Sequence, residues 1–259
     1  MWPSFNRETL REQRGLARSV LTYYGIPWRH RQLTHFFRTF IAPGDLCFDV
    51  GAHVGNRVRA WAALGAHVVA LEPQPICLRF LERWYGHNPQ VTIVDAAVGA
   101  APGTLDLQVS KATPTVTSLS SQWIDAVQQV DSFAGVTWDA AIPVTVTTLD
   151  RLIAQYGVPA FCKIDVEGYE LEVLRGLSQP VPALSIEFVP AALDVTYACL
   201  DRLTALGEYE FNWTLGERHV WCGSWGDVAD VRAFLHMLPP SGPSGDIYAR
   251  ARPGSSPAA

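Results

Sequence analysis

The sequence lacks several features that would assign it to a function class directly. Its five cysteines stand far apart without a C-x-x-C pair, which argues against a zinc site and favours free thiols in a cytoplasmic compartment. No segment resembles a signal peptide and no run of about 18 apolar residues is present, so we predict no membrane span. Lysine and arginine form no long run, and the net charge is −5. Because phosphate contacts need a basic face, we expect no nucleic-acid partner.

The composition that remains is typical of a folded α/β protein. Of the 259 residues, 48% are apolar and 17% are charged, which is ample for one core within a single domain. Basic residues are concentrated near the N-terminus, where we interpret them as the solvated face of a helix. They are Arg7, Arg11, Arg14, Arg18, Arg29 and Arg31.

The most informative segment is Leu46–Pro73. An apolar run that ends in Asp49 is followed by Gly51 and Gly55, a helical segment, and a second apolar run that ends in Glu72. This pattern predicts a strand, a tight turn, a helix and a second strand. Glycines at such a turn let backbone N–H groups approach a ligand, and an acid about 20 residues further on can accept both ribose hydroxyls. Glu72 follows Gly51 by 21 residues, so we predict a site for an adenosine-type ligand.

Three ligands compete for this unit. A dinucleotide fingerprint requires G-x-G-x-x-G, which the turn lacks. A phosphate loop requires Lys and a hydroxyl residue where this chain has Asn56 and Arg57. The remaining pattern, D-x-G-x-x-x-G, is similar to the first motif of S-adenosylmethionine-dependent methyltransferases. That ligand carries an ammonium and a carboxylate but no phosphate, so an acid such as Asp49 is acceptable beside it.

The rest of the pattern predicts a doubly wound α/β domain preceded by a helical cap. Residues 7–40 are predicted to form two helices that are broken near Gly25–Pro27. Three strands alternate with two helices over residues 45–95, which calls for parallel strands. Further strands are expected at 104–109, 161–165, 183–188, 209–213 and 246–251. We assign residues 1–42 to the cap, 43–251 to the α/β domain and 252–259 to a flexible tail.

One long segment, residues 111–143, shows no regular pattern. Irregular insertions of this length inside a compact domain are more often lids or substrate loops than inert connections. We therefore predict that it covers an acceptor site, with Trp123, Phe133 and Trp138 as apolar contacts.

The order of motifs over residues 45–190 resembles that of the FkbM-type methyltransferases, a branch of the class I S-adenosylmethionine fold. The most specific element is the string K-x-D-x-E-G-x-E-x-x-V-L-x-G, which starts at Lys163. The other matching segments are Phe48–Gly55, Leu71–Pro73, Asp95–Gly99, Thr148–Asp150 and Ser185–Phe188. His53 departs from the family, which usually has Asn there. The resemblance implies a mostly parallel seven-stranded Rossmann-like sheet, S-adenosylmethionine as cofactor, and O-methylation of a sugar, polyketide or other natural-product small molecule.

Two sets of site residues follow. For cofactor binding we predict Asp49, Gly51, Ala52, His53, Gly55, Asn56, Glu72, Pro73, Asp95, Ala96 and Asp165. For catalysis we predict Asp165, Glu187, Glu167 and His53. Asp165 is expected at a strand end on the same face as Lys163, and nearby acids are expected to raise its pKa so that it serves as general base. A helix is expected from about Glu167, and Asp95 could equally accept from adenine or cap a turn.

Several alternatives remain open from the sequence. Asp165 and Glu187 could instead hold a divalent cation, which we do not expect. A nicotinamide-dependent oxidoreductase and a non-catalytic nucleotide-binding protein on the same fold are the rival functions. The sequence leaves open the identity of the small-molecule acceptor and the oligomeric state.

Overall fold

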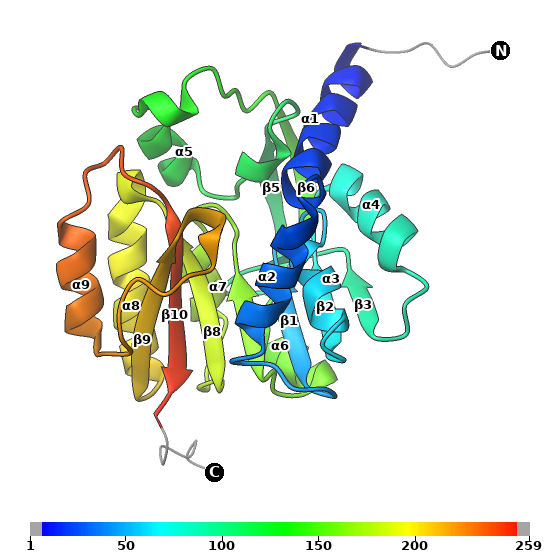
Figure 1. Cartoon of the computed structure of the whole chain (residues 1–259). Helices are drawn as coiled ribbons and strands as arrows, with labels where there is room; N and C mark the ends of the chain where they lie inside the picture. The colour runs from blue at the N-terminus through cyan, green and yellow to red at the C-terminus, as the bar shows by residue number, and fades with distance from the viewer. Residues whose placement is uncertain (1–6, 253–259) are drawn as a thin grey trace.

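A seven-stranded sheet forms the centre of the protein (Figure 1). The computed structural model describes residues 7–252, so the predicted tail after Arg252 and the first six residues of the predicted cap lie outside the described residues. The strand order is β3-β2-β1-β7-β8-β10-β9. Strand β10 is antiparallel to both neighbours, and the other pairs are parallel. The predicted doubly wound, mostly parallel sheet of seven strands is therefore confirmed.

The chain changes direction along the sheet between β1 and β7. The strands are β1 Leu46–Val50, β2 His67–Leu71, β3 Val91–Val94, β7 Phe161–Ile164, β8 Ala183–Phe188, β9 Tyr209–Leu215 and β10 Gly245–Ala251. The connection after β3 returns to the other side of β1, which makes the β1/β7 junction the topological switch point. Ligands of doubly wound sheets bind beyond the carboxyl ends of the strands at this point.

Helices cover both faces of the sheet. One face packs against α6 Leu149–Tyr156, α7 Glu170–Arg175, α8 Leu193–Leu206 and α9 Val228–His236. The other packs against α2 Pro27–Phe37, α3 Asn56–Ala62 and α4 Pro75–Tyr85. Because both faces are buried, β1 and β7 are apolar on nearly every residue, as parallel strands require. No helix among residues 7–252 is long and apolar enough to cross a membrane.

The N-terminal cap consists of two helices, as predicted. Helix α1 (Arg7–Tyr24) and α2 are separated at Gly25 and Ile26. Phe36 and Phe37 of α2 are buried in an aromatic cluster with Trp61 of α3 and Phe161 of β7. Helix α1 instead contacts the short 3-10 helix η1 (Pro114–Val116) and α4. The cap therefore binds one face of the sheet through α2 and extends past it through α1 (Figure 1).

The segment predicted to be irregular is more ordered than expected. It contains η1, α5 (Ser121–Val127), the 3-10 helix η2 (Asp131–Phe133), and the start of β6 (Ala140–Thr147). Strand β6 lies between β4 (Ala97–Val98) and β5 (Gly103–Val109) in a second, three-stranded sheet. Pro143 concealed β6 in the sequence, but it lies where β6 has only β5 as a neighbour, and such a position tolerates a residue without N–H.

The helix that was expected from Glu167 starts three residues later. Glu167 and Gly168 both have a left-handed backbone, with φ of 54° and 87°, which is incompatible with a helix start. The Glu170 carboxylate accepts hydrogen bonds from the N–H groups of Val166 and Gly168, at 3.1 and 3.2 Å, and so fixes a turn here. Glu167 therefore lies in a loop at the end of β7 and not in the first turn of α7.

Candidate active site

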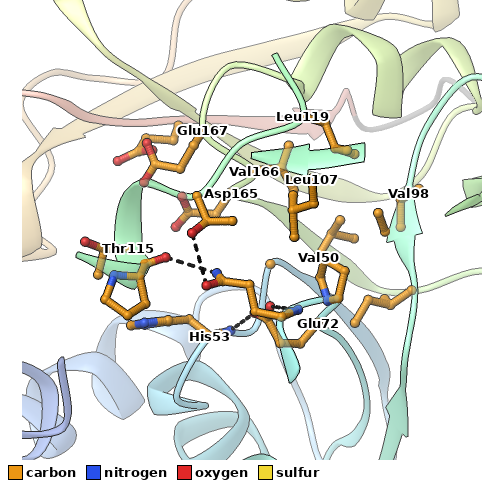
Figure 2. Close-up of a pocket in the computed structure, with 18 of the residues that line it drawn as sticks. Val50, His53, Glu72, Val98, Leu107, Thr115, Leu119, Asp165, Val166 and Glu167 are labelled. Carbon is orange, nitrogen blue, oxygen red and sulfur yellow. Dashed lines mark hydrogen bonds between the residues drawn. The ribbon is translucent and has the colours of Figure 1, made fainter. Parts of the chain in front are cut away.

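A pocket lies at the switch point, over the carboxyl ends of β1, β2 and β7 (Figure 2). Its floor includes Gly51, which follows β1 with φ of 86°. A Cβ at this position would lie 1.9 Å from the carbonyl oxygen of Asp165, so only glycine allows the turn and the end of β7 to approach each other. The glycine turn is therefore required by close packing as well as by its left-handed backbone.

Glu72 is held at the end of β2 by two backbone donors. The N–H of His53 donates to Glu72 Oε2 at 2.7 Å, and the N–H of Gln74 donates to Oε1 at 2.8 Å (Figure 2). Each carboxylate oxygen retains a second lone-pair direction for a ligand. Burial raises the pKa of Glu72 to about 7 even though both hydrogen bonds favour its ionised form. Glu72 is thus a fixed, buried acceptor at the position where the sequence predicted a ribose contact.

Apolar residues form the wall beyond Glu72. Ala96, Ala97 and Val98 follow β3, and Leu107 of β5 and Leu119 also line this part of the pocket. Residues 114–117 are held beside Gln74, another lining residue. The Gln74 side-chain amide donates to the carbonyl of Pro114, and the Thr117 hydroxyl donates to the side-chain oxygen of Gln74. Apolar side chains beside a ribose acceptor can contact a planar base.

A row of charged side chains lies on the face of the sheet that α2 and α3 cover. Lys163 of β7 is fully buried, and its ammonium lies 2.5 Å from Asp246 of β10 and 3.4 Å from Asp165. Arg57 of α3 contacts Asp165 from the other side at 3.2 Å. The charges therefore alternate in the order Arg57, Asp165, Lys163 and Asp246.

This row gives Asp165 a proton affinity opposite to the one predicted from the sequence. Burial would raise its pKa, but Lys163 and Arg57 outweigh burial and lower it to about 2. The expectation that neighbouring acids raise the pKa of Asp165 is therefore wrong, because two cations flank its carboxylate. Asp165 remains ionised at neutral pH.

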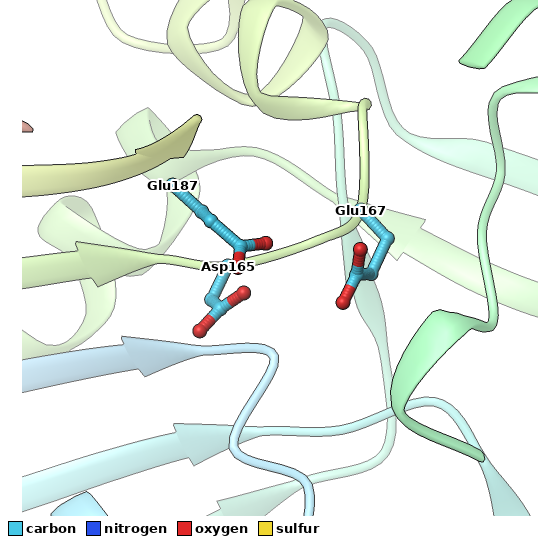
Figure 3. A group of neighbouring side chains, drawn as sticks. All are labelled: Asp165, Glu167 and Glu187. Atoms are coloured by element: carbon cyan, nitrogen blue, oxygen red, sulfur yellow. The ribbon is translucent and has the colours of Figure 1, made fainter. Parts of the chain in front are cut away.

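Two glutamates beside Asp165 behave differently. One oxygen each of Asp165, Glu167 and Glu187 lies within 4.8 Å of the others (Figure 3). Burial, followed by the charge of Asp165, raises the pKa of both Glu167 and Glu187 well above the usual range. The Oε2 atom of Glu187 is buried without a hydrogen-bond partner among the described residues. The three carboxylates could hold a divalent cation, or they could hold a proton on one of the glutamates.

Glu167 and Glu187 also line a second cavity of about 940 Å³. Its walls mix apolar and polar residues and come from separate segments, namely Val116, Val130, Phe133 and Val136, then Val189 to Ala191, then Pro240 to Ser244. Arg18 of α1 lies at its edge. The two glutamates therefore stand at the junction between the pocket and a larger cavity.

The predicted aromatic contacts are only partly placed at this cavity. Phe133 lines it, but Trp123 and Trp138 are not among its lining residues. Trp123 is fully buried against Gly168, where a Cβ would lie 2.1 Å from the indole. It also packs edge-on against Phe133 and Trp138. Trp123 therefore packs against the turn that contains Glu167 and Gly168. Because its indole is buried and does not line the cavity, it does not contact an acceptor there.

The structure brings most of the predicted site residues to the pocket, and leaves four aside. The lining includes Gly51, His53, Asn56, Glu72, Pro73, Ala96, Asp165, Glu167 and Glu187. Asp49, Ala52, Gly55 and Asp95 do not line it. Asp49 is buried behind the turn with both carboxylate oxygens unpartnered among the described residues, and burial raises its pKa to about 6. Asp95 is exposed.

His53 is placed in the turn mainly through its backbone. Its φ of 49° is left-handed, a conformation in which Asn and His occur more often than most residues. This explains why His can replace the Asn that is usual at this position. Burial lowers the pKa of the imidazole to about 4, so the ring is neutral at pH 7. The ring also packs edge-on against Tyr23.

Several lining residues were missed by the sequence analysis. Arg57 follows the glycine turn directly, so its charge next to Asn56 was a usable signal. Tyr23 reaches the pocket from α1, and Glu217 reaches it from the 3-10 helix η4 (Gly216–Arg218) after β9. Both lie outside the segments that match a motif, and no local pattern marked them.

Comparison with protein families identifies residues 49–235 as a methyltransferase FkbM domain. A search among curated proteins finds no match. The family match, together with the strand order, agrees with the fold and the family predicted from the motifs.

Similar solved structures share little sequence with this chain. A putative O-methyltransferase from Klebsiella pneumoniae is 9% identical with a TM-score of 0.47, over 97% of this chain and 92% of the other. An O-methyltransferase from Bacillus cereus in complex with SAH is 12% identical with a TM-score of 0.46, over 96% and 94%. A putative rRNA methylase from Clostridium thermocellum is 9% identical with a TM-score of 0.42, over 86% and 96%.

Proposed function

The chain belongs to the FkbM methyltransferase family, and from this premise we propose that it transfers the methyl group of S-adenosylmethionine to a hydroxyl of a small molecule. Transfer of a methyl group from S-adenosylmethionine follows from the family. The hydroxyl acceptor, on a sugar, polyketide or other natural product, is our proposal. The observation that carries it is the position of Glu167 and Glu187, which line both the pocket at the switch point and the larger cavity.

The pocket fits S-adenosylmethionine in the chemistry of its residues. Glu72 offers two fixed oxygens to a ribose diol, and the slot of Ala96, Val98 and Leu107 is suited to adenine. Asn56 and Arg57, which also line the pocket, would hold the methionine end. When bound, the group supplies an activated methyl carbon on a sulfonium.

Deprotonation of the acceptor is assigned to Glu187. An alcohol needs a base at its oxygen, and a carboxylate with a raised pKa is a stronger base than an ordinary one. Glu187 has a raised pKa and one buried oxygen without a partner, and it borders both cavities. Asp165 is too weakly basic for this role because Arg57 and Lys163 hold its pKa low. We infer that Asp165 instead supplies fixed negative charge beside the donor, and that Glu167 hydrogen-bonds the acceptor.

The proposal is tested by binding and by turnover. Calorimetric titration with S-adenosylhomocysteine and with NAD separates a methyltransferase from a nicotinamide enzyme, and we expect heat only with the former. A screen of hydroxylated natural products with methyl-labelled donor then tests the acceptor class. Labelled product formed from amines or carboxylates but not from alcohols would refute O-methylation.

Metal dependence is tested on the same assay. Because a proton on Glu167 can replace a shared cation and leave Glu187 ionised as the base, we expect activity to survive a chelator. Loss of activity with EDTA and its recovery with Mg²⁺ would assign the three carboxylates to a metal site. The protein would then be a metal-dependent methyltransferase, with the donor pocket unchanged.

A further inference from the structure

The charge of this protein is divided unevenly along the chain. The first 40 residues contain seven arginines and two glutamates, whereas the remainder contains 13 basic and 23 acidic residues. The net charge of −5 therefore conceals a basic N-terminal part. The expectation of no nucleic-acid partner rested on the absence of a basic face. The basic N-terminal part therefore calls for a closer look at where its arginines lie.

The basic residues lie on the outer surface of three helices. The exposed side chains are Arg11, Arg14 and Arg18 on α1, Arg31 on α2, and Arg79 and Arg83 on α4. Among the described side chains of these helices, the acids are Glu12 and Glu82. One of the arginines, Arg11, lies 3.8 Å from Asp139. The three helices therefore carry six exposed arginines against two acids among their described side chains.

An apolar groove lies between α1 and α4, the two helices that carry five of these arginines. It is lined by Gln13, Leu16, Ala17, Val20 and Leu21 of α1 and by Phe80 of α4. Leu21 is 72% exposed, and Trp84, which stacks on Phe80 with ring centroids 5.7 Å apart, is 65% exposed. Helices α1 and α4 stand side by side at this edge of the molecule (Figure 1). Exposed Leu and Trp beside arginines are typical of helices that lie in a membrane interface.

We propose that this α1/α4 surface binds the face of an anionic lipid bilayer, with Leu21 and Trp84 inserted among the headgroups. Charge complementarity favours this occupant over a second copy of the chain, because a two-fold contact would bring the arginines of both copies together. The groove favours lipid over nucleic acid, because its leucine, valine and alanine side chains offer no hydrogen bonds to bases or phosphates. Arginine side chains on the same two helices can reach headgroup phosphates.

The test is sedimentation of the full-length protein with vesicles. We compare vesicles of phosphatidylcholine alone with equimolar phosphatidylcholine and phosphatidylglycerol, in low salt and in about 0.5 M NaCl, where charges are screened within a few ångströms. We expect binding to the anionic vesicles, with most of it lost in high salt. Equal binding to both vesicle types, or no binding to either, overturns the proposal.

Variants identify the surface that binds. Arg14→Gln and Arg83→Gln should each weaken binding about fivefold, the factor expected for one basic residue near an anionic surface. The double variant Leu21→Ser with Trp84→Ser should also weaken it and should remove the blue shift of tryptophan fluorescence on vesicle addition. Met237→Ser is the matched control, because Met237 is 75% exposed at the end of α9 and far along the chain from this surface. Binding that all of these variants retain overturns the proposal.

Two other occupants give distinct results. Light scattering that shows a dimer of the native chain and a monomer of the Leu21→Ser and Trp84→Ser variant would assign the surface to self-association. Tight binding of a single-stranded RNA oligonucleotide, without binding to anionic vesicles, would assign it to nucleic acid. Either result replaces the lipid partner. The substituted side chains are exposed, so an unchanged thermal midpoint is expected and verifies folding.

Discussion

The two halves of the active site are built in different ways. The donor half is a compact unit in which residues 46–73 supply the turn, the ribose acceptor and the start of α3, all fixed by short backbone contacts. The acceptor half is assembled from segments near residues 116, 133, 190 and 242, and it rests on a separate hydrophobic cluster around Trp123. The first half can be inherited as one motif, whereas the second can change segment by segment. Among the described residues, only Glu167 and Glu187 line both cavities.

The largest expected effect on the rate comes from removing the proposed base, Glu187, which lines both cavities. Glu187→Gln preserves the shape of the side chain but removes its basicity, and we expect the rate to fall about 10²–10⁴-fold. Donor affinity should change little, because Glu72 and the adenine slot are intact. Single-turnover rates with labelled donor measure the loss. The matched variant is Asp165→Asn, which we expect to weaken donor binding as well as turnover.

The opposite assignment of the base would follow from a different result. In that case Asp165→Asn binds the donor with native affinity and loses all turnover, while Glu187→Gln stays active. Asp165 would then be the base in spite of its two cationic neighbours, and the donor half would contain the catalytic group.

Trp123 tests whether the acceptor half is energetically separate. The indole is fully buried and packs against the turn that contains Glu167 and Gly168. Trp123→Ala should therefore lower the free energy of unfolding by about 3–5 kcal/mol. We expect a higher KM for the acceptor and unchanged affinity for S-adenosylhomocysteine. Denaturant unfolding and calorimetry measure the two effects. Phe133→Ala is the control that removes a ring from the cavity wall without emptying the space beneath Gly168.

The contrast between the halves also explains what the sequence could and could not predict. Gly51, Glu72 and Asp165 were predictable because each lies at a strand end, where strand period and motif spacing fix the position. The low pKa of Asp165 was not, because Arg57 comes from a helix and Asp246, which holds Lys163, comes from the last strand. The same holds for Glu167, whose loop position depends on a left-handed backbone and on the Glu170 side chain. Contacts between distant segments decided the first case, and a local turn that the motif spacing does not reveal decided the second.

Within the donor half, Glu72 should account for a measurable part of the affinity. Glu72→Ala removes the acceptor for the ribose hydroxyls and leaves the N–H groups of His53 and Gln74 without a partner. We expect S-adenosylhomocysteine to bind about 1–3 kcal/mol more weakly, the scale of charged hydrogen bonds. Calorimetric titration of both proteins measures this difference in binding free energy. An affinity equal to that of the native protein would show that the ribose lies elsewhere.

The smallest expected effect is a pH dependence that belongs to the donor half alone. Burial raises the pKa of Glu72 to about 7 in the free protein, whereas ribose hydroxyls donate hydrogen bonds to a carboxylate and favour its ionised form. Donor binding should therefore release a proton from Glu72, and affinity should be constant above pH 7 and fall by up to about tenfold per pH unit below it. Titration of S-adenosylhomocysteine between pH 8 and pH 5.5 in two buffers of different ionisation enthalpy measures both the affinity and the proton release. Glu72→Gln should bind more weakly and lose this dependence, because it has no proton to release. If the glutamine variant keeps the same pH profile, the titrating group is a different one, and Asp49, with a pKa raised to about 6 behind the glycine turn, is the next to test.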